Sequence, residues 1–143
     1  MNKIIIDLNE DHVKIDEFMT KLESAVAGPD YIDHLLELES EFVKFAETHL
    51  VAHHQKEEEF LYKWMIEQNK NSDKDLIKKM VNDHEHFEAK TKWILNQLNQ
   101  YKGGVKIPLA ELGLEVSDFV NKYKEHLTRE TEFIFFIADG LNF

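Results

Sequence analysis

Residues 109–137, LAELGLEVSDFVNKYKEHLTRETEFIFFI, decide the fold that this chain is expected to adopt. Their apolar side chains recur every three or four residues, which is the spacing of one face of an α-helix. The face runs through Leu112, Val116, Phe119, Tyr123, His126, Glu130, Phe133 and Ile137. A histidine and a glutamate therefore lie on a face that we expect to be buried. A buried polar side chain needs a partner or a metal ion to offset its loss of hydration.

Three further amphipathic segments precede this one, and short breaks that carry most of the Gly and Pro separate them. We expect the first helix to begin near Asp7 and end at Gly28-Pro29, the second to run from about Asp30 to Gln68, and the third to run from about Ser72 to Lys102-Gly103-Gly104. Short connections join antiparallel neighbours. The sequence thus predicts an all-α, antiparallel up-down-up-down four-helix bundle that forms a single domain, residues 1–143.

Composition narrows the chemistry that such a bundle could support. The chain has 143 residues, a net charge of -11 and no cysteine. The negative charge argues against nucleic acid and anionic membranes as partners. Without thiolates, a metal ion would have to take nitrogen and oxygen ligands. The apolar run Ile4–Ile6 is far shorter than the core of a signal peptide, so we expect a cytoplasmic protein.

Histidines and glutamates four residues apart share a helix face, and four such pairs occur. They are His53/Glu57, His54/Glu58, His84/Glu88 and His126/Glu130. In the second helix the apolar stripe passes through Leu35, Phe42, Ala46, His49, His53, Glu57, Phe60 and Trp64, which favours His53/Glu57 over the neighbouring pair. An aromatic and apolar run follows both favoured glutamates, Phe-Leu-Tyr after one and Phe-Ile-Phe after the other. The second and fourth helices therefore use one local template.

The first and third helices carry a shorter template, an Asp-His pair with an apolar residue three positions later. It places His12 and His84 on core faces. At about 1.5 Å of helix rise per residue, Glu57, His84 and His126 lie level when counted from their connections. The first connection fits less well, because His12 lies about 16 residues before Gly28 and His53 about 24 beyond Pro29.

The other histidines and polar residues divide into two groups. His49 and Glu88 lie one helical turn from a predicted ligand, so each is a candidate ligand or a candidate hydrogen-bond partner of a ligand. His34, His54 and His86 fall off the stripes, and we expect them at the surface. Tyr123 lies on the core face, where an ordinary core role is the simplest interpretation.

This constellation resembles the hemerythrin-like family, the HHE cation-binding domain, over essentially the whole chain. The resemblance implies a non-heme di-iron site whose ligands are His12, His53, Glu57, His84, His126 and Glu130, with Glu57 and Glu130 bridging the ions. Oxygen-carrying hemerythrins differ at the positions of Glu88 and Thr131, which argues against reversible oxygen carriage. Many members of the family also double the Glu after the histidine, as Glu57-Glu58 does and Glu130-Thr131 does not.

Nitrogen and carboxylate ligands suit iron, and also manganese or zinc, so the donor set does not choose among them. With two Fe ions, the site is expected to bind or sense small ligands, namely dioxygen, nitric oxide or peroxide, or iron itself. A di-iron enzyme is the alternative, either peroxidase-like or active in nitric-oxide or iron-centre stress repair. A purely structural bundle is the third hypothesis. Ferritin-like oxidases are set aside, because no histidine has a glutamate three residues before it.

Overall fold

The predicted segments form four long helices, and none of the described residues lies in a strand. The computed structural model describes residues 2–68, 71–141 and 143. The first long helix is α1 (Lys3–Ala25) and the third is α5 (Asn71–Lys102). The second and fourth are each continuous but contain π-helical segments. Their parts are α2 (Tyr31–Phe45), η1 (Ala46–Leu50), α3 (Val51–Lys56), η2 (Glu57–Tyr62) and α4 (Lys63–Glu67), then α6 (Leu109–Arg129), η3 (Glu130–Ile134) and α7 (Phe135–Gly140). The all-α prediction is confirmed.

Local chemistry sets the helix ends, and one predicted end was wrong. The first helix begins at Lys3 rather than near Asp7, because the Asn2 side chain accepts a hydrogen bond from the Ile4 amide at 2.7 Å and caps the helix. The side chain of Ser72, the predicted start signal of the third helix, lies outside the described residues. After α5 the chain turns at Gly104, whose φ of 84° favours glycine.

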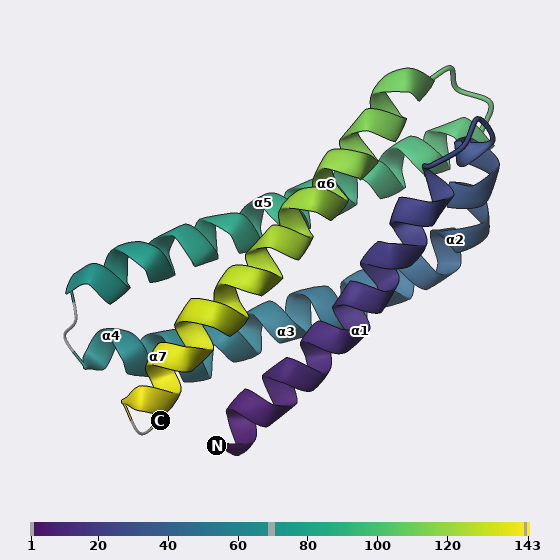
Figure 1. The fold of residues 1–143 in the computed structure, drawn as a ribbon. Helices are drawn as coiled ribbons and strands as arrows, with labels where there is room; N and C mark the ends of the chain where they lie inside the picture. The colour runs from purple at the N-terminus through teal and green to yellow at the C-terminus, as the bar shows by residue number, and fades with distance from the viewer. Residues whose placement is uncertain (1, 69–70, 142) are drawn as a thin grey trace.

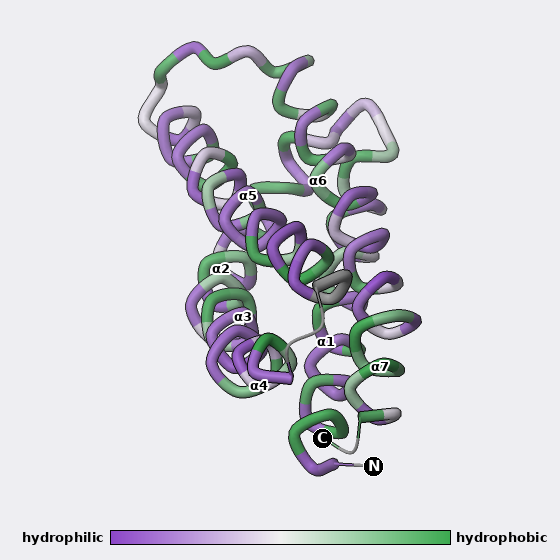
Figure 2. The backbone as a smooth tube through the Cα atoms, turned by 90° about the vertical axis from the view of Figure 1, so that its left-hand side faces the viewer, coloured by the Kyte–Doolittle hydropathy of each residue, from purple (hydrophilic) through white to green (hydrophobic). Residues whose placement is uncertain are grey.

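Consecutive long helices are neighbours in space, and the first also packs against the fourth. α1 contacts α2 and α6, and α5 contacts the same two helices. Followed by colour in Figure 1, the chain passes from one end of the bundle to the other four times and brings both termini to one end. Hydrophilic and hydrophobic stretches alternate along each helix in Figure 2, as expected of amphipathic helices around a shared core. Among the described residues, no helix combines the length and hydropathy of a membrane span.

The second long helix is not straight, and this explains the mismatch counted from the sequence. Figure 1 shows that it changes direction between α2 and α3, where η1 lies. A π-helical turn is one of the few established causes of a helix bend. The bent path is longer than the height it gains along the bundle, so His53 reaches the level of His12 despite the extra residues.

Two apolar clusters form the core, one toward each end of the bundle. One contains Phe18, Phe42, Phe119 and Leu98 among its buried members. The other contains Leu8, Leu61, Met80 and Ile134 among its own. On every long helix the predicted ligands lie where the residues of one cluster give way to those of the other. Apolar side chains therefore close the interior above and below this level.

The π-helical segments change which side chains are buried. For this reason two residues predicted in the core are exposed instead, and that prediction was wrong. Beyond Glu57 the sequence stripe continues to Phe60, but Phe60 is 53% exposed and Leu61 is buried. Beyond Glu130 it continues to Phe133, which is 52% exposed, while Ile134 is buried. A π turn contains one residue more than an α turn, so every later side chain is rotated to the next position.

Candidate metal centre

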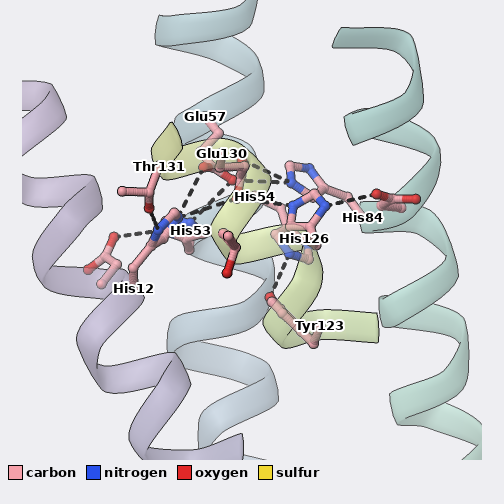
Figure 3. Close-up of polar contacts among 12 residues, drawn as sticks. His12, His53, His54, Glu57, His84, Tyr123, His126, Glu130 and Thr131 are labelled. Atoms are coloured by element: carbon pink, nitrogen blue, oxygen red, sulfur yellow. Dashed lines mark hydrogen bonds and ion pairs between the residues drawn. The ribbon is translucent and has the colours of Figure 1, made fainter. Parts of the chain in front are cut away.

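Six side chains from all four long helices converge between the two apolar clusters. They are His12 on α1, His53 on α3, Glu57 at the start of η2, His84 on α5, His126 on α6 and Glu130 at the start of η3. All six are buried, and the most exposed of them is His12 at 7%. Figure 3 shows their side chains pointing toward one another. The structure thus brings together the whole set that the sequence predicts as ligands.

Each of the four imidazoles is fixed from behind through its Nδ1 atom. His53 Nδ1 lies 3.0 Å from Asp11 Oδ2, and His126 Nδ1 lies 2.9 Å from Asp83 Oδ2. His12 Nδ1 lies 3.2 Å from Thr131 Oγ1, and His84 Nδ1 lies 3.3 Å from Glu58 Oε2. An ionised carboxylate can only accept, so the Nδ1–H groups of His53, His84 and His126 donate outward, and the Thr131 hydroxyl is able to accept from His12 in the same way. In the neutral imidazole, the form that binds a metal ion, the lone pair of Nε2 then points inward.

The inward-facing atoms lie close together without satisfying one another. His53 Nε2 is 3.2 Å from Glu57 Oε1, and His126 Nε2 is 3.0 Å from Glu130 Oε1. His84 Nε2 is 3.1 Å from Glu57 Oε1, and His12 Nε2 is 3.3 Å from Glu130 Oε1. Within the described ranges, all four Nε2 atoms, both Glu57 oxygens and Glu130 Oε1 are buried without a hydrogen-bond partner. Such atoms are costly in a folded interior, and a cation would satisfy them together.

The six residues form two groups that share both glutamates. Half A contains His12 and His53, and half B contains His84 and His126; each half is completed by Glu57 and Glu130. The possible donor atoms of each group lie within 4.8 Å of one another. Each glutamate contacts histidines of both halves. The arrangement is therefore suited to two ions joined by two carboxylates.

The donor set and its spacing fit a transition-metal ion. Imidazole and carboxylate donors bind such ions at about 2.0–2.2 Å, so two donors on one ion lie roughly 3 Å apart. The closest imidazole–carboxylate separations, 3.0 to 3.3 Å, agree with this spacing. The backing of each imidazole by a carboxylate or hydroxyl is also the usual environment of a metal-bound histidine.

Without a metal ion, the nearby carboxylates favour protonation of the buried imidazoles. Burial would lower the pKa of His84, but the nearby carboxylates of Glu130, Glu57 and Glu58 raise the pKa to about 11. Burial likewise opposes protonation of His53, while the charge of Glu57 and the bond to Asp11 raise its pKa to about 9. A metal ion binds neutral imidazole, so it would displace these protons.

The local sequence explains why the two glutamates point inward together. Glu57 begins η2 and Glu130 begins η3, so the π turn follows the same step of the His-x-x-x-Glu template in both helices. π-helical turns inside α-helices recur at functional sites because the extra residue re-aims the side chains around it. Sequence periodicity does not reveal the turn itself. The repeat of the template is the one signal that pointed to a shared local structure.

His54 was predicted at the surface, and this prediction was wrong. It is 1% exposed, and its ring stacks on the His84 ring with centroids 3.8 Å apart. Its Nε2 atom lies 2.8 Å from the Tyr123 hydroxyl, also buried. Burial, with the charges of His84 and His53, lowers the pKa of His54 well below its usual value. A neutral imidazole paired with a phenol explains how this off-stripe histidine is accommodated.

The remaining polar candidates occupy peripheral positions. His34 and His86 are exposed as expected, and His49 is half-buried with its ring beside the Phe45 ring. Glu88 Oε2 lies 3.6 Å from His54 Nδ1, so Glu88 stands behind His54 rather than within either half. Sequence reasoning missed Tyr62, whose hydroxyl donates a hydrogen bond to Glu130 Oε2. The π turn is what brings that phenol inward.

Comparison with known proteins gives one match. A family model described as the hemerythrin HHE cation-binding domain matches residues 3–136. Neither the curated proteins nor the solved structures give a match. The matched family and the two buried histidine–glutamate groups together indicate a helical, metal-binding protein.

Proposed function

Because the chain belongs to the family of hemerythrin HHE cation-binding domains, we propose that it binds two iron ions in a non-heme centre and uses them to bind or sense dioxygen, nitric oxide or iron. The six buried residues of half A and half B would hold the ions. Glu57 and Glu130 would bridge them.

One observation carries this proposal. Seven inward-facing nitrogen and oxygen atoms are buried without a hydrogen-bond partner among the described residues, and they belong to His12, His53, Glu57, His84, His126 and Glu130. A bundle whose histidines merely pack has no need of this arrangement, since with neutral imidazoles each of these groups is buried without a partner at a cost in free energy. Two cations would remove most of that cost at once.

The donor count favours small ligands over a purely structural role for the ions. Each half offers two imidazoles and a share of two carboxylates, which leaves a position free on an ion that takes five or six ligands. A ferrous pair would supply reducing electrons and open positions for dioxygen, nitric oxide or peroxide. The apolar clusters close the bundle interior on either side of these positions along its axis.

A peroxidase-like activity is the second candidate, and Tyr62 favours it. Its phenol is buried, donates to Glu130 and stacks on His84 with ring centroids 5.8 Å apart. Burial and the nearby Glu130 charge raise the pKa of Tyr62 well above its usual value, so the hydroxyl keeps its proton. Reduction of a peroxide consumes protons, which water would supply, while this hydroxyl would hold the Glu130 carboxylate in place by its hydrogen bond.

Metal loading tests the proposal. Metal-free protein is loaded with ferrous iron under anaerobic conditions and desalted, and about two irons per chain are expected. His53→Ala combined with His126→Ala removes one imidazole from each half and should abolish stoichiometric binding while circular dichroism stays helical. His34→Ala with His86→Ala removes two exposed histidines and should retain both ions. Retention of two ions by the first double variant would overturn the site assignment.

A further inference from the structure

Half A and half B are related by an approximate two-fold repeat, and the repeat is broken behind one histidine of each half. Glu58 follows Glu57 as Thr131 follows Glu130. Each reaches the Nδ1 atom of a histidine on another helix: Glu58 reaches His84, and Thr131 reaches His12. The same structural position thus carries a carboxylate in half B and a hydroxyl in half A.

This difference acts on the ligands themselves. A carboxylate that accepts the Nδ1–H bond raises the basicity of the imidazole and fixes its tautomer, which strengthens the Nε2–metal bond. A hydroxyl makes a weaker, uncharged contact at the same place. The Asp11 and Asp83 contacts behind the other two histidines are nearly equal, at 3.0 and 2.9 Å. The two halves therefore differ in the group behind one histidine each, a carboxylate behind His84 and a hydroxyl behind His12.

The two halves also differ in how they meet the surface. A cavity of about 660 Å³ opens between α1 and the fourth long helix, and His12 and Thr131 are among its lining residues. Asp16, Glu17 and Glu132 outnumber the single Lys124 along its walls, so its charge favours cations. On the other side, a cavity of about 380 Å³ reaches Asp83, the residue behind His126, and is lined by neither histidine of half B.

The half B histidine His84 is covered from within the bundle. The His54 ring stacks on its face with an interplanar angle of 5°, and the Tyr62 ring stacks on it at 17°. Among the residues that the structure describes, His12 has one comparable cover, the Phe135 ring at 28°. Both histidines of half B are therefore backed by carboxylates, and His84 is covered on its faces. In half A the exposed edge is His12, which is backed by a hydroxyl and lines the cleft between α1 and the fourth long helix.

We infer that the two metal positions are unequal: half B binds the first ion and retains it, while half A holds an exchangeable ion that enters and leaves through the cleft between α1 and the fourth long helix, past Thr131. This inference rests on the proposed function, because it presupposes two ions. It assigns Glu58 and Thr131 as positioning residues that set the retention of each ion.

A chelator challenge on the full chain tests this inference. Protein loaded anaerobically with cobalt(II) is mixed with excess chelator, and release is followed by the loss of the cobalt absorption bands. One ion per chain should leave rapidly and the other slowly. Thr131→Glu should slow the rapid phase by roughly 10–100-fold, and Glu58→Thr should speed the slow phase by a similar factor, the usual effect of a residue behind a metal-bound histidine.

Matched variants control for charge alone. Thr128→Glu adds a carboxylate to the lining of the same cleft, and Glu59→Thr removes an exposed one next to Glu58. Neither should alter the two phases by more than about twofold, because surface charges act weakly. Equal release of two ions from the wild-type protein would overturn the inference and leave the proposed function intact. Failure to bind any ion would overturn both.

Discussion

Half A and half B begin from the same local sequence and finish with different surroundings. In both, a His-x-x-x-Glu step is followed by a π turn, and an aspartate from the neighbouring helix fixes the histidine of that step. The residue after each glutamate lies behind a histidine of the opposite half. Glu58 places a carboxylate behind His84 of half B, where the buried His54 adds a second layer. Thr131 places a hydroxyl behind His12 of half A, and a cleft lies beyond it. A repeated template therefore fixes where the donor atoms converge, while single residues around it are expected to set how tightly each half retains its ion.

Removing one half at a time gives the largest expected effect. His12→Ala with His53→Ala should lower the capacity to one ion per chain, and so should His84→Ala with His126→Ala, because each pair supplies both imidazoles of one half. The protein that keeps half B should bind its ion more tightly than the protein that keeps half A. Isothermal titration with cobalt(II) measures both quantities, and the reverse order of affinities would contradict the comparison.

Substitutions at the positions that the π turns bury should have the next largest effect, a loss in the free energy of unfolding. Leu61→Ala and Ile134→Ala empty equivalent buried positions in the two template helices and should each lower the free energy of unfolding by roughly 2–5 kcal/mol. Phe60→Ala and Phe133→Ala change exposed side chains and should cost less than about 1 kcal/mol. Urea denaturation of the metal-free protein measures each change. A larger loss at Phe60 than at Leu61 would mean that the helix is a plain α-helix there.

The stability of the metal-free protein should depend on pH through a histidine of each half. The raised pKa values of His53 and His84 stabilise the folded state below the ordinary histidine pKa of about 6.5. That contribution is lost as the pH rises through about 9 for His53 in half A and about 11 for His84 in half B. The melting temperature should thus fall between pH 7 and 10, by roughly 2–4 °C for each kcal/mol lost. Metal-loaded protein should lack this fall, since its histidines carry no such protons.

Exchanging the aromatic residues behind the two glutamates should give the smallest effect. Tyr62→Phe leaves Glu130 Oε2 without its donor and should cost roughly 1–3 kcal/mol in the metal-free protein. Phe135 occupies the equivalent position after η3 and stacks on His12. Phe135→Tyr adds a hydroxyl on the side of half A, and should change stability by less than Tyr62→Phe does. Thermal denaturation compares the two; a greater loss in Phe135→Tyr would show that the halves are not equivalent in shape.

The six converging residues could be predicted because helical spacing is a property of the sequence itself. His126 and Glu130 stand four residues apart on one apolar face, and the same holds for His53 and Glu57. The π turns could not be predicted, since a single extra residue leaves the apolar pattern before it intact and rotates only the side chains after it. For that reason Phe60 and Phe133 were placed inside, and Tyr62 was missed.

His54 shows a second limit of reasoning from one helix at a time. Adjacent residues of an α-helix point about 100° apart, so His54 cannot share the face of His53. It is nevertheless buried, because α5 and the fourth long helix supply His84 and Tyr123 on that side. Partners of this kind come from tertiary packing, and the sequence of the second helix alone contains no sign of them.

X-ray absorption at the iron edge of anaerobically loaded protein tests the central claim most directly, because it reports both the ligands and a neighbouring metal. If Glu57 and Glu130 join two ions, the spectrum should show nitrogen and oxygen donors at about 2.0–2.2 Å together with an iron–iron scattering path of roughly 3–4 Å, in protein that carries two irons per chain. A single iron per chain, or two irons without metal–metal scattering, would contradict a centre shared between half A and half B.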